Sequence, residues 1–146
     1  MALEKRGKHL YGETQADIPE ALRRYGKLAG YPPAHFADAL CTCGSRRFRL
    51  LLDDDEGVAI RVCPACGLEH PMGDSDEYLE DASPEECECP CGTGTFELTV
   101  GVALYEGSED VRWLYVGCRC AACGLTACYG DWKNEFNGYA ELLRRV

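Results

Sequence analysis

The chain has 146 residues, of which 46% are hydrophobic, as is typical of a folded protein. No apolar run approaches the roughly 18 residues that a membrane-spanning helix needs, and the first residues are charged, so we expect no membrane span, no signal peptide and a cytoplasmic location. The formal net charge of -10 opposes long-range attraction to nucleic acid and favours a cationic partner.

Eleven cysteines are many for a chain with no predicted secretion signal. In a reducing compartment such a count indicates metal ligands more often than disulfides. An odd total also argues against a complete set of disulfides. The cysteines are therefore candidate metal ligands.

The first region, residues 1–40, is predicted to hold a poorly ordered polar arm over residues 1–16 and then a helix. Asp17 is a suitable N-cap, and apolar residues recur at helical spacing from Ile18 to Ala29. We expect this helix to pack its apolar stripe on the first cysteine-containing module. Residues 34–40 are expected to add a short helical turn.

Residues 41–74 form the first predicted module, a β-hairpin between two cysteine pairs. Apolar residues alternate along both strands, and an acidic turn, Asp53, Asp54, Asp55 and Glu56, joins them. The period of two places Phe48, Leu50, Leu52, Val58, Ile60 and Val62 on the core face and Arg47, Arg49 and Arg61 on the opposite face.

Residues 75–88 are acidic and poor in apolar residues, which predicts a linker or a solvated helix. A second module follows over residues 89–131, with a longer hairpin whose return strand, Val111 to Val116, is apolar on both faces. Burial on both faces predicts that this strand lies between layers or at an interface. The tail, residues 132–146, is expected to end in a short amphipathic helix from Tyr139.

The two modules repeat one pattern at fixed offsets. Cys41-x-Cys43-Gly44 matches Cys89-x-Cys91-Gly92, and Cys63-x-x-Cys66-Gly67-Leu68 matches Cys120-x-x-Cys123-Gly124-Leu125. So many matches at fixed offsets predict an internal duplication of one supersecondary unit.

The unit resembles a zinc ribbon, in which two cysteine knuckles joined by a β-hairpin bring four thiolates to one ion. The resemblance implies a small, metal-stabilised α+β fold with two tandem modules and two Zn²⁺ per chain. It also implies two ligand sets: Cys41, Cys43, Cys63 and Cys66 at the first site, and Cys89, Cys91, Cys120 and Cys123 at the second. The first knuckle of each module is C-x-C-G, one residue tighter than the usual C-x-x-C.

Some surplus residues keep alternatives open. Cys87 is a rival to Cys89, although the repeat favours Cys89, and His70 is a minor rival to a first-site cysteine. Cys87 and Cys118 are interpreted as packed free thiols, with a redox-active pair as the alternative, and Cys128 as a core residue. Rubredoxins hold iron in a similar four-cysteine geometry, but their paired C-x-x-C knuckles differ from the C-x-C spacing here, so we expect structural zinc.

Two functions follow as hypotheses. The first is a non-enzymatic protein-interaction or regulatory adaptor, because four cysteines per ion leave no open position for catalysis. Its predicted contacts with a basic partner are the acidic turn and the aromatic residues Trp113, Tyr115, Trp132 and Phe136. The second is nucleic-acid binding through Arg46, Arg47, Arg49 and Arg61. These arginines are also positioned in sequence to neutralise the acidic turn.

Overall fold

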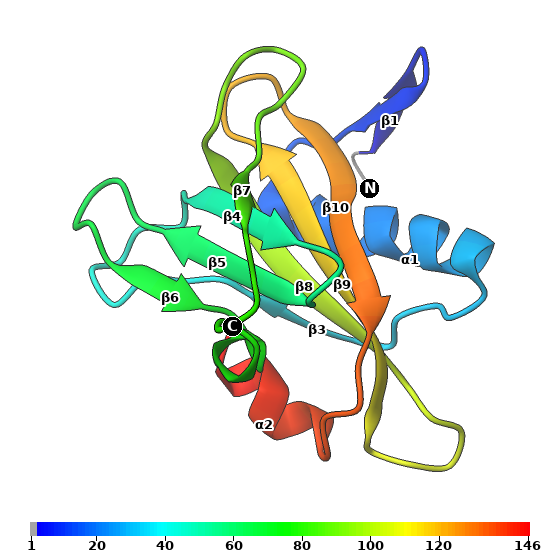
Figure 1. Cartoon of the computed structure of the whole chain (residues 1–146). Coiled ribbons are helices and arrows are strands. Elements are labelled where there is room, and N and C mark those ends of the chain that lie inside the picture. The colour runs from blue at the N-terminus through cyan, green and yellow to red at the C-terminus, as the bar shows by residue number, and fades with distance from the viewer. Residues whose placement is uncertain (1–2) are drawn as a thin grey trace.

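Two antiparallel sheets and two helices make up the computed structural model, which describes residues 3–146 (Figure 1). The larger sheet has the strand order β1-β2-β10-β9-β8-β3, and the smaller has the order β6-β5-β4-β7. The larger sheet contains β1 (Glu4–Arg6), β2 (His9–Tyr11), β3 (His35–Asp38), β8 (Phe96–Leu104), β9 (Val111–Cys120) and β10 (Leu125–Lys133). The smaller contains β4 (Arg49–Asp53), β5 (Val58–Val62), β6 (Glu69–Pro71) and β7 (Glu85–Glu86).

Each module is a three-stranded meander rather than a hairpin alone. The predicted hairpins are present as β4–β5 and β8–β9, and after the second knuckle the chain returns as a third strand, β6 or β10. The hairpin pattern in the sequence does not predict these third strands. A bridge between Phe48 and Phe96 joins the two modules, because each backbone N–H donates to the other residue's carbonyl at 2.8 Å.

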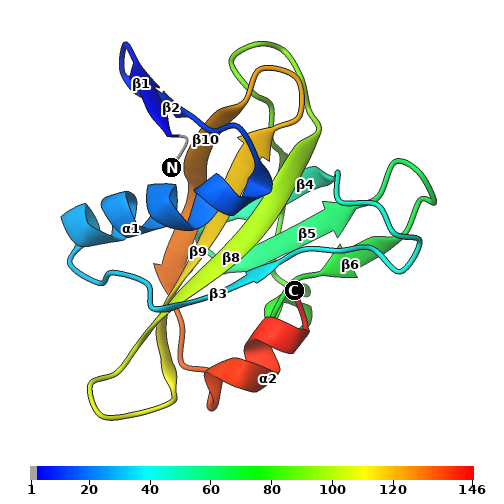
Figure 2. The same cartoon turned by 180° about the vertical axis from the view of Figure 1, so that it is seen from behind.

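The molecule has three layers, with the larger sheet in the middle (Figures 1 and 2). The smaller sheet covers one face of it, and helix α1 (Ile18–Ala29) covers the other. The predicted bounds of α1 are confirmed, but its predicted packing on the first module is wrong. Ile18 and Leu22 pack on Ala103 and Tyr115 of the second module.

Strand β9 is buried on both faces, as predicted. Leu114 and Val116 face the smaller sheet, whereas Tyr115 lies under α1 and is fully buried. Gly117 lets the helix approach closely, because a Cβ at this position would overlap Ile18 Cγ2 and meet Leu22 Cδ2 at 3.0 Å.

Two predicted local structures are wrong. The expected disordered arm contains the β1–β2 hairpin, paired to β10, although residues 1–2 of the arm lie outside the described part. The expected helical turn over residues 34–40 is instead strand β3, which pairs with β8. The acidic segment 75–88, predicted as a linker or a solvated helix, is mostly exposed; it contains a 3-10 turn, η2 (Ser75–Glu77), and then β7, which pairs with β4.

The register of the first hairpin corrects the face assigned to β5. Leu50 pairs with Arg61 and Leu52 with Ala59, so Arg61 shares the core face. Opposed residues of an antiparallel pair point to the same side of the sheet, and Arg61 is only 6% exposed. The four-residue turn between Asp53 and Val58 shifts the alternation by one residue relative to the prediction.

The C-terminus folds back on the first module. The predicted C-terminal helix is confirmed as α2 (Tyr139–Arg144). After it, the carbonyl of Arg145 accepts from Gly73 N at 2.9 Å and lies 2.6 Å from His70 Nε2, and the carbonyl of Val146 accepts from Arg61 Nε at 3.1 Å. Among the described residues, no helix is long and apolar enough to cross a membrane.

Candidate metal centres

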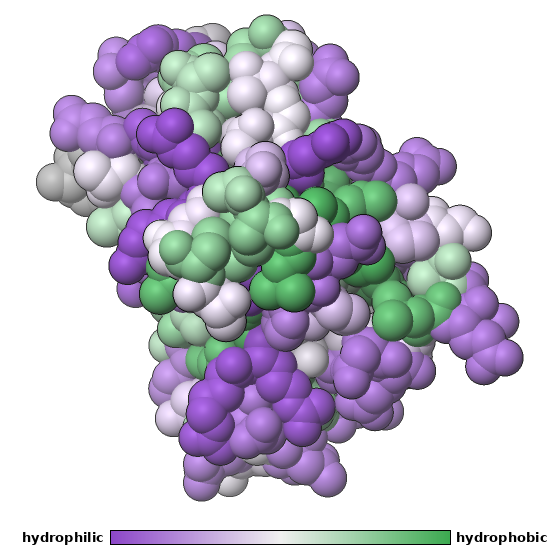
Figure 3. Space-filling model, turned by 90° about the vertical axis from the view of Figure 1, so that its left-hand side faces the viewer, coloured by the Kyte–Doolittle hydropathy of each residue, from purple (hydrophilic) through white to green (hydrophobic). Residues whose placement is uncertain are grey.

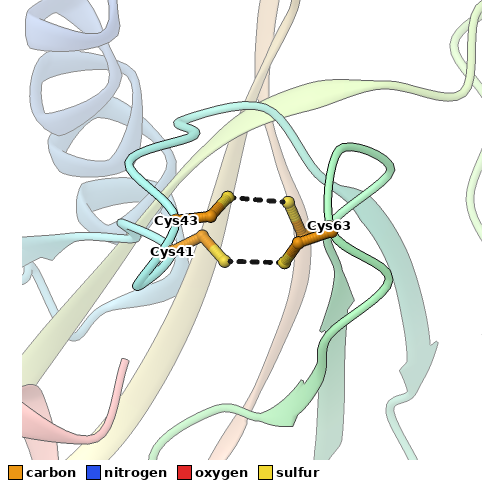
Figure 4. A group of neighbouring side chains, drawn as sticks. Cys41, Cys43 and Cys63 are labelled. Carbon is orange, nitrogen blue, oxygen red and sulfur yellow. Dashed lines mark hydrogen bonds between the residues drawn. The ribbon is translucent and has the colours of Figure 1, made fainter.

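The fold brings together both predicted sets of four cysteines. In each set the four Sγ atoms lie within 4.8 Å of one another. The shortest first-site separations are 3.5 Å between Cys41 and Cys66 and 3.6 Å between Cys43 and Cys63; Figure 4 shows the thiols converging from two facing loops. At the second site, Cys89 to Cys123 and Cys91 to Cys120 are each 3.6 Å.

The four knuckles share one backbone design. The glycine after each cysteine pair has a positive φ: +94° at Gly44 and Gly92, +79° at Gly67 and +84° at Gly124. Glycine adopts this conformation without steric cost. It lets each glycine N–H donate to the carbonyl of the first cysteine of its pair, as Gly44 does to Cys41 at 2.8 Å and Gly92 to Cys89 at 2.8 Å. The tight C-x-C knuckle therefore closes in the same way in both modules.

The sulfur spacing fits a tetrahedral ion. Four thiolates at about 2.3 Å from a zinc ion lie about 3.8 Å apart, close to the observed separations. The eleven cysteines are all free thiols. One cysteine of each pair is buried and the other exposed, so each site lies at the edge of the core with one side toward solvent.

The thiols of each set ionise unequally. Burial opposes ionisation of Cys63, but the backbone N–H groups of Cys66 and Ala65 favour its thiolate and bring its pKa down to about 6. Thr93 lowers the pKa of Cys91 to about 6 in the second set. Burial is the main reason that the pKa of Cys89 rises to about 12. Neighbouring thiolates repel one another, so a divalent cation is the group that this donor set favours.

Arg61 places a buried cation near the first site. Its guanidinium lies 4.8 Å from the centroid of the Phe48 ring, and its Nη1 is buried without a hydrogen-bond partner. Burial lowers the pKa of Arg61, whereas Cys41 and Cys63 act to raise it. The corresponding residue of the repeat is Cys118. Arg61 therefore offsets negative charge at the first site alone.

The surplus residues lie outside both sets. Cys118 is fully buried, and burial raises its pKa well above the ordinary value. Cys87 is half-buried with a pKa raised to about 11, mainly by burial. The Sγ of Cys128 donates to the carbonyl of Gly130 at 3.3 Å. His70 is engaged with the C-terminal backbone rather than with the first site.

The predicted partner-binding residues differ in exposure. Asp54, Asp55 and Glu56 are exposed, but the Asp53 carboxylate holds the turn by accepting from the N–H groups of Asp55 and Glu56 at 3.1 Å and of Ser83 at 2.8 Å. The expected exposure of the aromatic set is wrong for two members. Tyr115 is fully buried and donates to the carbonyl of Tyr31 at 2.6 Å, and Trp132 is 8% exposed. Trp113 and Phe136 are half-buried.

The four arginines do not form one face. Arg46 and Arg47 are exposed, whereas Arg49 is paired with both carboxylate oxygens of Glu86, its Nε lying 2.7 Å from Oε2. Arg61 points into the core. Figure 3 shows a protrusion of apolar to weakly polar residues on the face near the first site, with hydrophilic residues above and below it. Leu40 and Leu68, which flank first-site cysteines in the sequence, are 49% and 42% exposed.

Comparison with known proteins adds one relative. The chain is 42% identical over 57 residues to diphthamide biosynthesis protein 3 of Candida glabrata, and the match covers 36% of this chain and 68% of that protein. The chain belongs to the diphthamide biosynthesis protein 3 family. No protein-family model matches it, and no solved structure shows significant similarity. The match covers about a third of this chain. The two repeated modules, residues 41–131, are together longer than the matched segment.

Proposed function

We propose that the chain is a non-enzymatic protein-interaction adaptor with two structural zinc-ribbon sites, each holding one Zn²⁺. The observation that carries the proposal is the pair of four-thiol clusters at the edge of one shared core. Four protein ligands complete a tetrahedral zinc shell, so the ion supplies folding free energy rather than a reactive water. The C-x-C knuckle spacing, unlike that of rubredoxin, favours zinc over iron.

The surroundings of the histidines also support a non-enzymatic role. The ring of His35 stacks on Tyr139 with centroids 3.9 Å apart, and His70 contacts the carbonyl of Arg145. Both side chains are thus used in packing the C-terminal segment. A structural scaffold uses its polar groups in this way.

A basic protein is the partner class that the charge distribution favours. The net charge is -10, and the exposed residues of the β4–β5 turn are acidic. Two of the four arginines proposed to contact nucleic acid are already engaged or buried, Arg49 with Glu86 and Arg61 in the core. Electrostatic complementarity therefore favours a cationic protein surface over a phosphate backbone. We also propose a cytoplasmic location, because a chain whose eleven cysteines are free thiols suits a reducing compartment.

Family membership supplies a specific version of this proposal. The relative is named for diphthamide biosynthesis, and we extend to this chain an auxiliary role in that process. In a host that makes diphthamide, deletion of the gene should lower the diphthamide content. Unchanged content would remove this version while leaving the adaptor proposal in place.

Metal analysis tests the zinc sites directly. The purified full-length chain should carry about two zinc ions, measured by mass spectrometry of the metal and by release with a thiol-modifying reagent. Cys66→Ser, which changes an exposed first-site thiol, should leave less than one zinc ion per chain, whereas the surplus Cys87→Ser should retain two. A folded metal-free chain, or one that carries iron, would contradict the zinc assignment.

Affinity capture from the native host tests the adaptor role. The zinc-loaded chain should retain a protein whose contact surface is basic, and the interaction should weaken as salt is raised. Failure of the wild-type chain to retain any protein would count against the adaptor.

A further inference from the structure

A cavity of about 400 Å³ lies where the first module meets the end of β10. Its walls come from the β4–β5 turn, the segment around η2 and the chain at residues 132–135; Figure 1 shows the β4–β5 turn reaching toward the end of β10. Five carboxylates line it, those of Asp54, Asp55, Glu56, Asp74 and Glu135. We call this cavity the acidic pocket.

The charge of the acidic pocket is not balanced from within the chain. Among the described residues, Asp54, Asp55, Glu56 and Asp74 form no ion pair with a lysine or arginine. Lys133 also lines the pocket, but it pairs with Glu135 at 3.4 Å. Asp74 is 4% exposed and accepts only a neutral donor, Asn134 Nδ2, at 3.0 Å. A buried carboxylate without a cationic partner favours a ligand that brings one.

Trp132 provides a second and independent observation. This side chain lines the pocket and is 8% exposed, and its Nε1 is buried without a hydrogen-bond partner. The Nε1 edge lies against Gly57, where a Cβ would be 3.3 Å from Nε1 and where φ is +70°. A buried donor without an acceptor is unfavourable, because it loses its hydrogen bonds to water and gains none in the protein. Because Gly57 and Trp132 both line the pocket, this unsatisfied donor lies at the pocket wall.

The ligand must therefore offer a cation and a hydrogen-bond acceptor together. A metal ion fits poorly, because among residues 3–146 the only groups of three or more cysteine, histidine or acidic ligand atoms within 4.8 Å are the two cysteine sets. A basic residue in a polypeptide has both features, since its side chain is cationic and its backbone carbonyl accepts. Tyr78, 47% exposed, adds an aromatic face on which such a cation is favourable.

We propose that the acidic pocket binds an arginine or lysine side chain of a partner polypeptide, whose backbone carbonyl accepts a hydrogen bond from Trp132 Nε1. This inference rests on the proposed adaptor function and names the contact through which the adaptor recognises a basic partner.

Nuclear magnetic resonance of the zinc-loaded full chain tests the pocket. The probes are the blocked peptide acetyl-Gly-Arg-Gly-amide, its lysine analogue and its neutral citrulline analogue. The charged peptides should move the indole N–H signal of Trp132, identified by its loss in Trp132→Phe. The Trp113 indole is an internal control, because its Nε1 already donates to Asp131 Oδ2 at 2.9 Å. Equal responses to arginine and citrulline peptides would overturn the charge requirement.

A matched pair of variants tests the location. Asp55→Asn with Glu56→Gln neutralises two exposed charges and should weaken peptide binding by about fivefold or more. The control, Glu106→Gln with Glu109→Gln, makes the same charge change in the β8–β9 turn, which is outside the pocket, and should leave the affinity within about twofold. Equal weakening in both variants would show a general charge effect and overturn the pocket.

Further probes separate the sources of the cation. Spermidine and calcium chloride are the competing cations. If either one moves the indole N–H signal of Trp132 as strongly as the peptides do, recognition of a polypeptide is overturned. Suppose that the wild type and the Asp55→Asn, Glu56→Gln variant capture a partner equally, and that the peptides do not move the Trp132 signal. This result would overturn the pocket but leave the adaptor proposal intact. Capture of no protein by wild type, with the peptide response present, would overturn the adaptor alone.

Discussion

Replacement of Cys43 by serine should unfold both modules, although the residue belongs to the first site only. Cys43 is exposed, so the substitution removes a thiolate without opening a cavity in the core. Loss of a structural zinc site removes about 10 kcal/mol, as judged from zinc-finger peptides. This is comparable to the entire stability of a small domain, about 5–15 kcal/mol.

The packing between the sheets decides whether the damage spreads. One continuous core contains fully or almost fully buried side chains from both modules, namely Phe48, Leu50 and Leu52 from the first module and Phe96, Leu98, Val100, Val102 and Val116 from the second. Each such side chain contributes about 1.5–3 kcal/mol by burial. Because compact unfolded chains already bury part of this area, their combined contribution is on the order of 10 kcal/mol. The larger sheet is therefore not expected to survive alone once the smaller sheet melts.

Hydrogen–deuterium exchange of the variant measures this coupling. Backbone amides of β8 and β9 should lose protection together with those of β4 and β5, and the bound zinc should fall below one ion per chain. Cys87→Ser, outside both sites, should keep wild-type protection. Retained protection in β8 and β9 with loss in β4 and β5 would refute the shared-core reasoning.

Two further predictions concern the face under α1. Gly117→Ala should destabilise the chain by about 1–3 kcal/mol in denaturant unfolding, because the added methyl group overlaps Ile18 Cγ2 and crowds Leu22. An unchanged midpoint would show that the helix is not held this closely. Burial, and then the charge of Asp131, raises the pKa of Cys128, so this thiol stays protonated where an ordinary thiol ionises. In the native chain its alkylation rate should keep rising about tenfold per pH unit beyond pH 9, and a plateau near pH 8.5 would contradict the raised pKa.

The sequence alone predicts the parts of this fold whose causes are local. Helix α1 begins and ends where the N-cap, the apolar spacing and Gly30 indicate, and the glycines after each cysteine pair have the positive φ that a knuckle requires. The duplication predicts which cysteines lie together, because two copies at fixed offsets must form the same loops. These features depend on backbone preferences within a few residues.

Only the tertiary structure decides the features that depend on residues far apart in the chain. Strands β3, β6, β7 and β10 are short or weakly patterned, and each exists because a neighbouring strand offers unpaired backbone groups. Arg61 is buried rather than exposed because the length of the β4–β5 turn sets the register. The acidic pocket joins segments that are distant in sequence, so no local pattern predicts it. Local spacing thus determines the metal-binding loops, whereas packing of the two modules into one core decides what the surface offers to a partner.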